Sequence, residues 1–220
     1  MSLEVIEFES APNPTASIII LHGLGADGND FVPIAQELNL ASVGPVRFVF
    51  PSAPTRPVTI NGGYLMRAWY DILGTEVARR EDEAGLRASQ AQIEALIANE
   101  RARGIAANRI VLAGFSQGCA MTFMAGLRHG ERLAGLLGMS GYLPLADLTA
   151  TERSAANAGV PIFQAHGSAD PMITMARATA SRDALIALGY PVEWHAYPMP
   201  HSVCPQEIVD MNRWLLRVLA

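Results

Sequence analysis

Ser116 is the side chain best placed to do chemistry in this sequence. It stands at the centre of a G-x-S-x-G pentapeptide, residues 114–118. An apolar run rich in β-branched residues, 109–113, precedes it, and a good helix former, 119–125, follows. A serine between strand and helix is typical of a nucleophile elbow, whose hydroxyl attacks an acyl carbon. The alternative is a chance match in a glycine-bearing turn, and the flanking elements favour the elbow.

Steric crowding explains why the pentapeptide has glycine at its first and last positions. A sharp strand-to-helix turn brings the two elements close together at Gly114 and Gly118, which carry no Cβ to clash. The turn forces the serine into an unfavourable backbone conformation and places it at a helix N-terminus. Backbone N–H groups there favour the negative charge that develops during acyl transfer.

A serine hydroxyl is a weak nucleophile and needs a general base, which in turn needs an orienting carboxylate. At a nucleophile elbow of this kind these groups follow in the order Ser, Asp, His, each after a later strand. Asp170 lies just past the predicted strand 161–166, so we predict that it is the acid. Because Pro171 follows it, Asp170 could also cap a helix. His201 follows the predicted strand 192–197 and precedes the last helix, where the base belongs.

The other four of the five histidines fit the role of base less well. His129 is expected at a helix end on the surface, and His195 lies inside a strand. His166 closes the strand before the proposed acid. His22 precedes Ser116, in the first loop of the predicted site, where a structural hydrogen-bonding role is expected.

Two backbone amides are expected to bind the oxyanion. One belongs to Gln117, the residue after the nucleophile. The second is assigned to Leu24, in the glycine-rich loop 22–28 that follows the apolar strand 16–21. The alternative is an ordinary glycine-rich turn, for example one that binds phosphate. However, the loop matches neither a P-loop nor a dinucleotide fingerprint.

The elements that position these residues alternate along the chain, which predicts an α/β fold with a mostly parallel sheet covered by helices on both faces. No linker or repeat divides the chain, so residues 1–220 are expected to form a single domain. The stretch 51–80 is predicted to be irregular, a wall or flap beside the active site. Strands are expected at 3–8, 16–21, 46–50, 109–113, 133–139, 161–166 and 192–197, and helices at 31–38, 81–103, 117–128, 172–188 and 205–219.

Composition narrows the function classes. The net charge is −5 and no apolar run approaches the roughly 18 residues of a membrane span, so neither nucleic-acid binding nor stable membrane insertion is expected. The first residues lack the pattern of a signal peptide. Two cysteines cannot form a disulfide framework, and their spacing is not a zinc pattern, so a cytoplasmic location is expected.

Part of the stretch 51–80 is apolar. Leu65, Trp69 and Tyr70 could face an acyl chain and are predicted to bind substrate. For Leu65 and its neighbour Met66, ordinary burial is an equally good interpretation.

Five motifs follow one another along the chain. They are His22-Gly23-Leu24-Gly25, Trp69-Tyr70-Asp71, Gly114-Phe115-Ser116-Gln117-Gly118, His166-Gly167-Ser168-Ala169-Asp170-Pro171 and His201-Ser202-Val203-Cys204-Pro205. In this order they resemble the phospholipase/carboxylesterase family, which includes bacterial carboxylesterases, acyl-protein thioesterases and lysophospholipases. The resemblance spans nearly the whole chain. It implies an α/β-hydrolase fold without a large cap domain, and the same catalytic residues. One departure is Pro200, since many members have glycine before the catalytic histidine.

These residues predict a serine carboxylesterase that cleaves small esters or thioesters of short to medium acyl chains, without metal or organic cofactor. An acyl-protein thioesterase or a lysophospholipase would use the same groups. A non-catalytic ligand-binding protein of this fold is the alternative from another class. The chain is expected to be a monomer or a homodimer.

Overall fold

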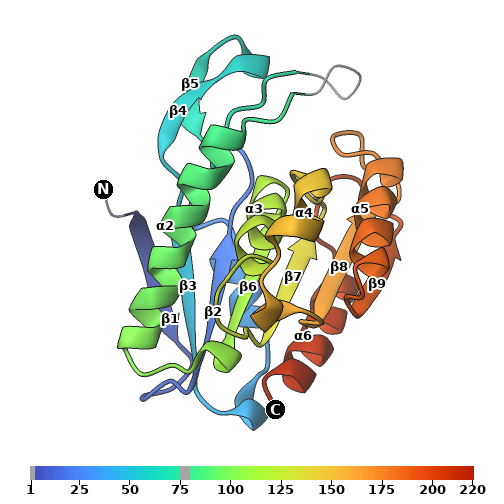
Figure 1. Cartoon of the computed structure of the whole chain (residues 1–220). Coiled ribbons are helices and arrows are strands. Elements are labelled where there is room, and N and C mark those ends of the chain that lie inside the picture. The colour runs from blue at the N-terminus through green and yellow to red at the C-terminus, as the bar shows by residue number, and fades with distance from the viewer. Residues whose placement is uncertain (1–2, 75–79) are drawn as a thin grey trace.

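One central sheet joins strands from both ends of the chain (Figure 1). The computed structural model describes residues 3–74 and 80–220. Within them, seven strands pair in the order β1-β3-β2-β6-β7-β8-β9. β1 runs antiparallel to β3, and every other neighbouring pair is parallel. The strands are β1 (Glu4–Glu9), β2 (Ala16–Leu21), β3 (Val46–Ser52), β6 (Ile110–Phe115), β7 (Gly135–Met139), β8 (Ile162–Gly167) and β9 (Val192–Tyr197).

Both faces of this sheet are buried, as its continuous apolar strands predict. In β2, Ile19 and Leu21 point into one core cluster, while Ile18 and Ile20 point into the other. Successive side chains of a strand alternate between faces, so an uninterrupted apolar run fills two cores at once.

Helices cover each face of the sheet. Helices α2 (Glu83–Ala102), α3 (Gln117–Gly126) and α5 (Met175–Ala187) pack on the first cluster. Helices α1 (Val32–Glu37) and α6 (Pro205–Val218) pack on the second. The short helix α4 lies on the α3 side (Figure 1). It spans Ala146–Glu152, and single 3-10 turns occur at Ala41–Val43, Thr59–Asn61, Ala107–Arg109 and Ala155–Asn157.

The predicted α/β architecture is confirmed, with a mostly parallel sheet and helices on both faces. Each predicted strand and helix has a counterpart whose bounds differ by at most three residues. Helix α4 was not predicted, because its seven residues are too few for a clear helical repeat.

The prediction of an irregular stretch at 51–80 is wrong for its first half. Strands β4 (Thr55–Val58) and β5 (Tyr64–Arg67) form an antiparallel hairpin that rises above the sheet (Figure 1). Gly62 and Gly63 make its turn with positive φ angles of 66° and 78°. Pro57 obscured the strand in the sequence, since proline is excluded from central strands but tolerated at an edge. The flap prediction also covers residues 75–79, which lie outside the described residues.

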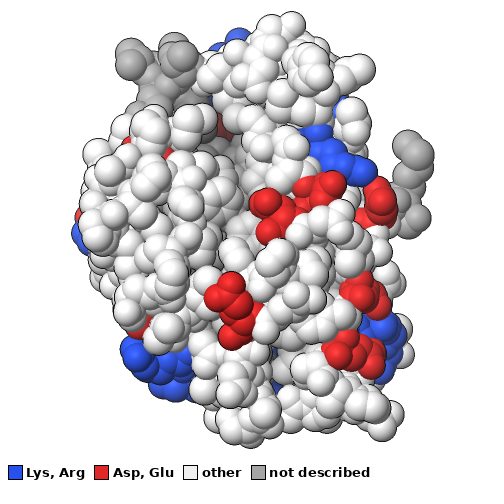
Figure 2. Space-filling model, turned by 180° about the vertical axis from the view of Figure 1, so that it is seen from behind, with Lys and Arg blue, Asp and Glu red and all other residues white. Residues whose placement is uncertain are grey.

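One face of the molecule carries its charges in small, separate groups. On the face opposite to that of Figure 1, acidic and basic side chains are interspersed over a largely uncharged surface (Figure 2). Among the described residues, no helix combines the length and apolar character that crossing a bilayer needs.

Candidate active site

Ser116 occupies the turn between β6 and α3. Its φ of 56° and ψ of −115° lie in a region that non-glycine residues rarely adopt. A Cβ added at Gly118 would lie 2.0 Å from the carbonyl oxygen of Leu21, and one at Gly114 would lie 2.3 Å from that of Gly118. Both positions therefore require glycine, for the steric reason inferred from the sequence.

Asp170 and His201 meet at the carboxyl ends of β8 and β9. Nδ1 of His201 donates to Oδ2 of Asp170 at 2.7 Å. The other oxygen, Oδ1, accepts from the backbone N–H groups of Met172 at 2.8 Å and Ile173 at 3.0 Å. The carboxylate is thus held in one orientation, and it fixes the histidine tautomer. Nε2 of His201 is left as the proton acceptor. The alternative that Asp170 caps a helix is wrong, because α5 begins at Met175 with Thr174 at its N-cap. The two N–H groups that Asp170 accepts belong to its own loop.

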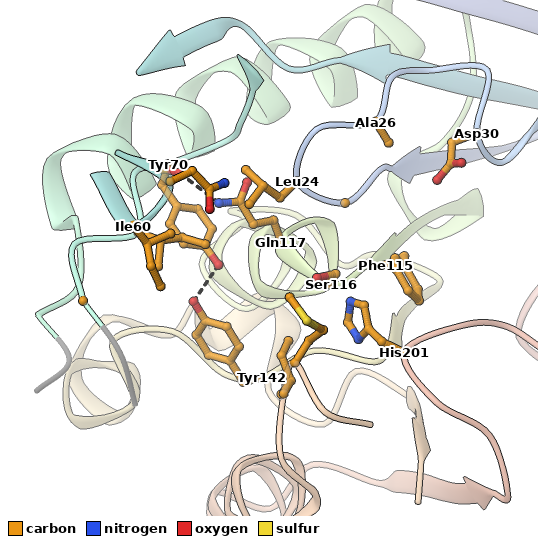
Figure 3. A pocket seen from close by; sticks show the side chains of 16 residues that line it. Leu24, Ala26, Asp30, Ile60, Tyr70, Phe115, Ser116, Gln117, Tyr142 and His201 are labelled. Carbon is orange, nitrogen blue, oxygen red and sulfur yellow. Dashed lines mark hydrogen bonds between the residues drawn. The ribbon is translucent and has the colours of Figure 1, made fainter. Parts of the chain in front are cut away.

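The same pocket is lined by Ser116 and His201. Figure 3 shows the imidazole beside the serine, with the ring of Phe115 next to it. The ring centroids of Phe115 and His201 lie 4.7 Å apart, so the imidazole packs against an aromatic wall. The structure therefore brings together all three residues that the order rule selected.

Leu24 and Gln117, the predicted oxyanion donors, also line this pocket. The loop that carries Leu24 is anchored by His22, which is buried. Nδ1 of His22 bonds the carbonyl oxygen of Gly23 at 2.6 Å, and the N–H of Ala53 donates to Nε2 at 2.9 Å. Burial lowers the pKa of His22, so the ring is neutral and can accept at Nε2. His22 thus has the structural role expected of it.

The pocket has a volume of about 520 Å³, within the usual range for small-molecule sites. Its two ends differ (Figure 3). Tyr70, Tyr142 and Ile60 lie on one side of Ser116, and His201 and Asp30 lie on the other. The lining residues are Gly23, Leu24, Ala26, Asp30, Ile60, Asn61, Tyr70, Ile72, Gly74, Phe115, Ser116, Gln117, Tyr142, Met172, Ile173 and His201.

Two of the three predicted substrate-binding residues lie away from the pocket. Tyr70 lines it, but Leu65 projects from β5 with 64% of its surface exposed, and Trp69 is fully buried. The indole Nε1 of Trp69 donates to the carbonyl oxygen of His22 at 2.9 Å. The structure therefore does not support the prediction that these two residues contact an acyl chain. Trp69 braces the loop that carries Leu24, and Leu65 lies on the exposed hairpin, next to the exposed Tyr64.

Sequence reasoning missed the side chain of Gln117 and the ring of Tyr142. Nε2 of Gln117 donates to the carbonyl oxygen of Tyr70 at 2.9 Å, and its Oε1 accepts from the N–H of Trp69 at 3.0 Å. Tyr142 follows β7, so the rule that ligands bind beyond the carboxyl ends of parallel strands could have found it. The expectation that His129 lies on the surface is also wrong, because this residue is buried and hydrogen-bonded to Glu94 at 2.6 Å.

Comparison with known proteins finds relatives that match nearly the whole chain. The sequence profile of the phospholipase/carboxylesterase family matches residues 2–219. The chain is 40% identical to acyl-protein thioesterase 1 of Yarrowia lipolytica, covering 91% of each chain. It is 40% identical to acyl-protein thioesterase 1 of Mycosarcoma maydis, covering 98% of this chain and 96% of that one. The crystal structure of Zea mays acyl-protein thioesterase 2 superimposes with a TM-score of 0.88 at 27% identity over 99% of both chains. The α/β-hydrolase prediction is confirmed.

Proposed function

Because the chain belongs to the phospholipase/carboxylesterase family, we propose that it is a serine carboxylesterase. It hydrolyses carboxylic esters of short to medium acyl chains through Ser116, His201 and Asp170. One observation carries this proposal: the 2.7 Å bond between His201 and Asp170 stands at a pocket that also contains the strained elbow serine. An esterase needs this combination of nucleophile, base and orienting acid.

The mechanism is acyl transfer to water. Nε2 of His201 takes the proton of Ser116 while Oγ forms a bond to the carbonyl carbon of the substrate. The tetrahedral intermediate collapses, the bond to the leaving oxygen or sulfur breaks, and Nε2 returns the proton to that leaving group. Water then repeats the sequence on the acyl-enzyme and releases the acid. Asp170 stabilises the imidazolium in both half-reactions, acylation and deacylation.

The oxyanion is bound by the backbone N–H groups of Leu24 and Gln117. Both belong to rigid segments, the loop fixed by His22 and the first turn of α3. Donors that are already oriented need no reorganisation as charge develops. The loss of one such donor typically costs about 3–4 kcal/mol of barrier. The N-terminus of α3 adds a favourable dipole at the same position.

The two ends of the pocket suggest how a substrate lies. His201 must reach the leaving group to protonate it, so the leaving group occupies the end with His201 and Asp30. The acyl chain then occupies the end with Tyr70, Tyr142 and Ile60. A pocket of about 520 Å³ that holds both parts suits short to medium acyl chains.

Thioester hydrolysis on acylated proteins is the second candidate. Its support is that relatives 40% identical over most of the chain are named acyl-protein thioesterase 1. A thiolate leaves more readily than an alkoxide, so the same groups serve both bonds. A lysophospholipase would differ only in leaving group and acyl length.

A set of four substrates, assayed with two proteins, tests the proposal and separates these candidates. Wild-type protein and Ser116→Ala are assayed with nitrophenyl butanoate, octanoate and palmitate, and with a palmitoyl-thioester peptide. We expect turnover of the shorter esters by the wild type and none by Ser116→Ala. A strong preference for the palmitoyl thioester would favour the second candidate. Absence of turnover on every substrate would favour a non-catalytic ligand-binding protein.

The remaining features of the proposal concern the setting of the enzyme. The partner is a small ester or thioester, and the protein acts as a monomer or homodimer in the cytoplasm. Both cysteines are free thiols in the structure, which suits a reducing compartment. Residues 1–220 form a single domain. The proposed reaction uses no metal or organic cofactor.

A further inference from the structure

Two tyrosine hydroxyls meet in the wall of the pocket. The hydroxyl oxygens of Tyr70 and Tyr142 lie 2.6 Å apart in a hydrogen bond, although the residues are 72 positions apart in the sequence. Both side chains are buried, with 3% of their surface exposed. In Figure 3 the pair lies on the side of Ser116 opposite to His201. This is the end that the proposed function assigns to the acyl chain.

A second, much smaller cavity lies on the other side of these rings. Tyr70, Tyr142 and Ile72 line both the pocket and this cavity. The remaining walls of the two spaces differ in chemistry. The pocket is also lined by the apolar residues Ile60, Met172 and Ile173, with Asn61, whereas the cavity is lined by Leu73 and by four charged residues, Asp71, Arg80, Glu81 and Asp82. The tyrosine pair therefore separates an apolar space from a charged one.

Both rings are mounted on rigid supports. The carbonyl oxygen of Tyr70 is held by the amide of Gln117 at 2.9 Å, which ties it to the nucleophile helix. The ring of Tyr142 lies under the guanidinium of Arg177, whose carbon is 3.3 Å from the ring centroid. The next residue, Leu143, donates its N–H to Oγ of Ser181 at 2.9 Å. A wall fixed on both sides cannot easily yield to a growing acyl chain.

We infer that the hydrogen-bonded pair of Tyr70 and Tyr142 is the partition that sets the upper limit of acyl chain length. This inference rests on the proposed function. A chain that stops at the partition buries its methylenes against apolar side chains, and each adds about fourfold to kcat/KM. A longer chain must displace a fixed ring or enter a space lined by charged groups, so the gain ends there.

The test is an acyl-length profile with matched variants. Nitrophenyl butanoate, octanoate, dodecanoate and palmitate are hydrolysed by the wild type, Tyr142→Ala, Tyr142→Phe and Leu65→Ala. Removing the phenol ring frees the space that the ring itself fills, in front of the charged cavity. Tyr142→Ala should therefore raise the ratio of dodecanoate to octanoate kcat/KM more than about tenfold, since each methylene newly enclosed in that space adds about fourfold. Tyr142→Phe keeps the ring and should keep the wild-type limit. Leu65→Ala, exposed and away from the pocket, should not change the profile.

Rates are normalised to the fraction of serine that a fluorophosphonate labels, so that partial misfolding does not imitate a change in specificity. Tyr142→Val serves if Tyr142→Ala does not fold. If the acyl-length profile of Tyr142→Ala, or of Tyr142→Val, superimposes on that of the wild type, the proposed partition is refuted. An equal shift with Tyr142→Phe or Leu65→Ala would overturn it too. If the wild type hydrolyses none of these esters, the proposed function itself has failed.

Discussion

Replacing Gln117 with alanine should destabilise the protein and loosen the wall of the pocket. The side-chain amide of Gln117 satisfies two backbone groups, the N–H of Trp69 and the C=O of Tyr70, at 3.0 and 2.9 Å. Gln117 and both partner residues are buried, so alanine removes the two hydrogen bonds that Gln117 makes to these backbone groups. The backbone N–H of residue 117, which we assign to the oxyanion, is retained.

The magnitude follows from the two lost hydrogen bonds. A buried polar group that loses its partner costs about 1–3 kcal/mol, and local relaxation recovers part of that cost. We expect a loss of about 2–4 kcal/mol in the free energy of unfolding. In a protein of this size each kcal/mol corresponds to about 2–4 °C, so Tm should fall by about 4–16 °C.

The assay is urea unfolding followed by circular dichroism, with Gln117→Glu as the matched variant. Glutamate still accepts from the N–H of Trp69, but when ionised it places a second oxygen against the carbonyl of Tyr70. Protonation restores a donor, so the stability of this variant should recover toward the wild-type value in acid. If Gln117→Ala unfolds within about 0.5 kcal/mol of the wild type, the clamp has no energetic importance and the reasoning is wrong.

Three further predictions concern strain, pH and thiol reactivity. Ser116→Gly should be about 1 kcal/mol more stable than Ser116→Ala, because glycine relieves the positive φ of 56°; equal urea midpoints would contradict a strained elbow. Burial raises the pKa of Glu207 from 4.5 to about 8. The native state therefore holds a proton that the unfolded state releases, and stability falls as pH rises from 4.5 to 8. We count half of this pKa shift, at about 1.4 kcal/mol per pKa unit. Glu207→Gln should then be on the order of 2 kcal/mol more stable than the wild type at pH 8 and equally stable near pH 4. Parallel curves of Tm against pH for the two proteins would refute this. Burial also raises the pKa of the Cys119 thiol, so iodoacetamide should modify it only after denaturation, and labelling of native protein at Cys119 would show that the elbow helix opens.

Sequence patterns predicted the sheet and selected the three proposed catalytic residues for a physical reason. A strand such as β2, buried on both faces, needs an unbroken apolar run, which is visible without any structure. The elbow requires Gly114 and Gly118 at fixed positions. Topology then dictates that the acid and the base follow later strands, which selects Asp170 and His201.

The lining of the pocket was not predictable in the same way. A tryptophan such as Trp69 suits a core and a groove equally well, and only the packing of the hairpin decides between them. Leu65 lies in β5, opposite Pro57 of β4, and this proline hid the hairpin in the sequence. The partners of Gln117 and Tyr142 are far away in sequence, at Trp69 and Tyr70, and such pairs carry no local signal.

The central claim is that His201 activates Ser116 for acyl transfer. Intact-mass spectrometry after treatment with a fluorophosphonate tests it directly, with wild-type protein, Ser116→Ala and His201→Ala compared at neutral pH. The account predicts a single adduct on Ser116 of the wild type, none on Ser116→Ala, and labelling of His201→Ala slowed by at least about a hundredfold. Labelling of His201→Ala at the wild-type rate, or an adduct that persists in Ser116→Ala, would contradict it.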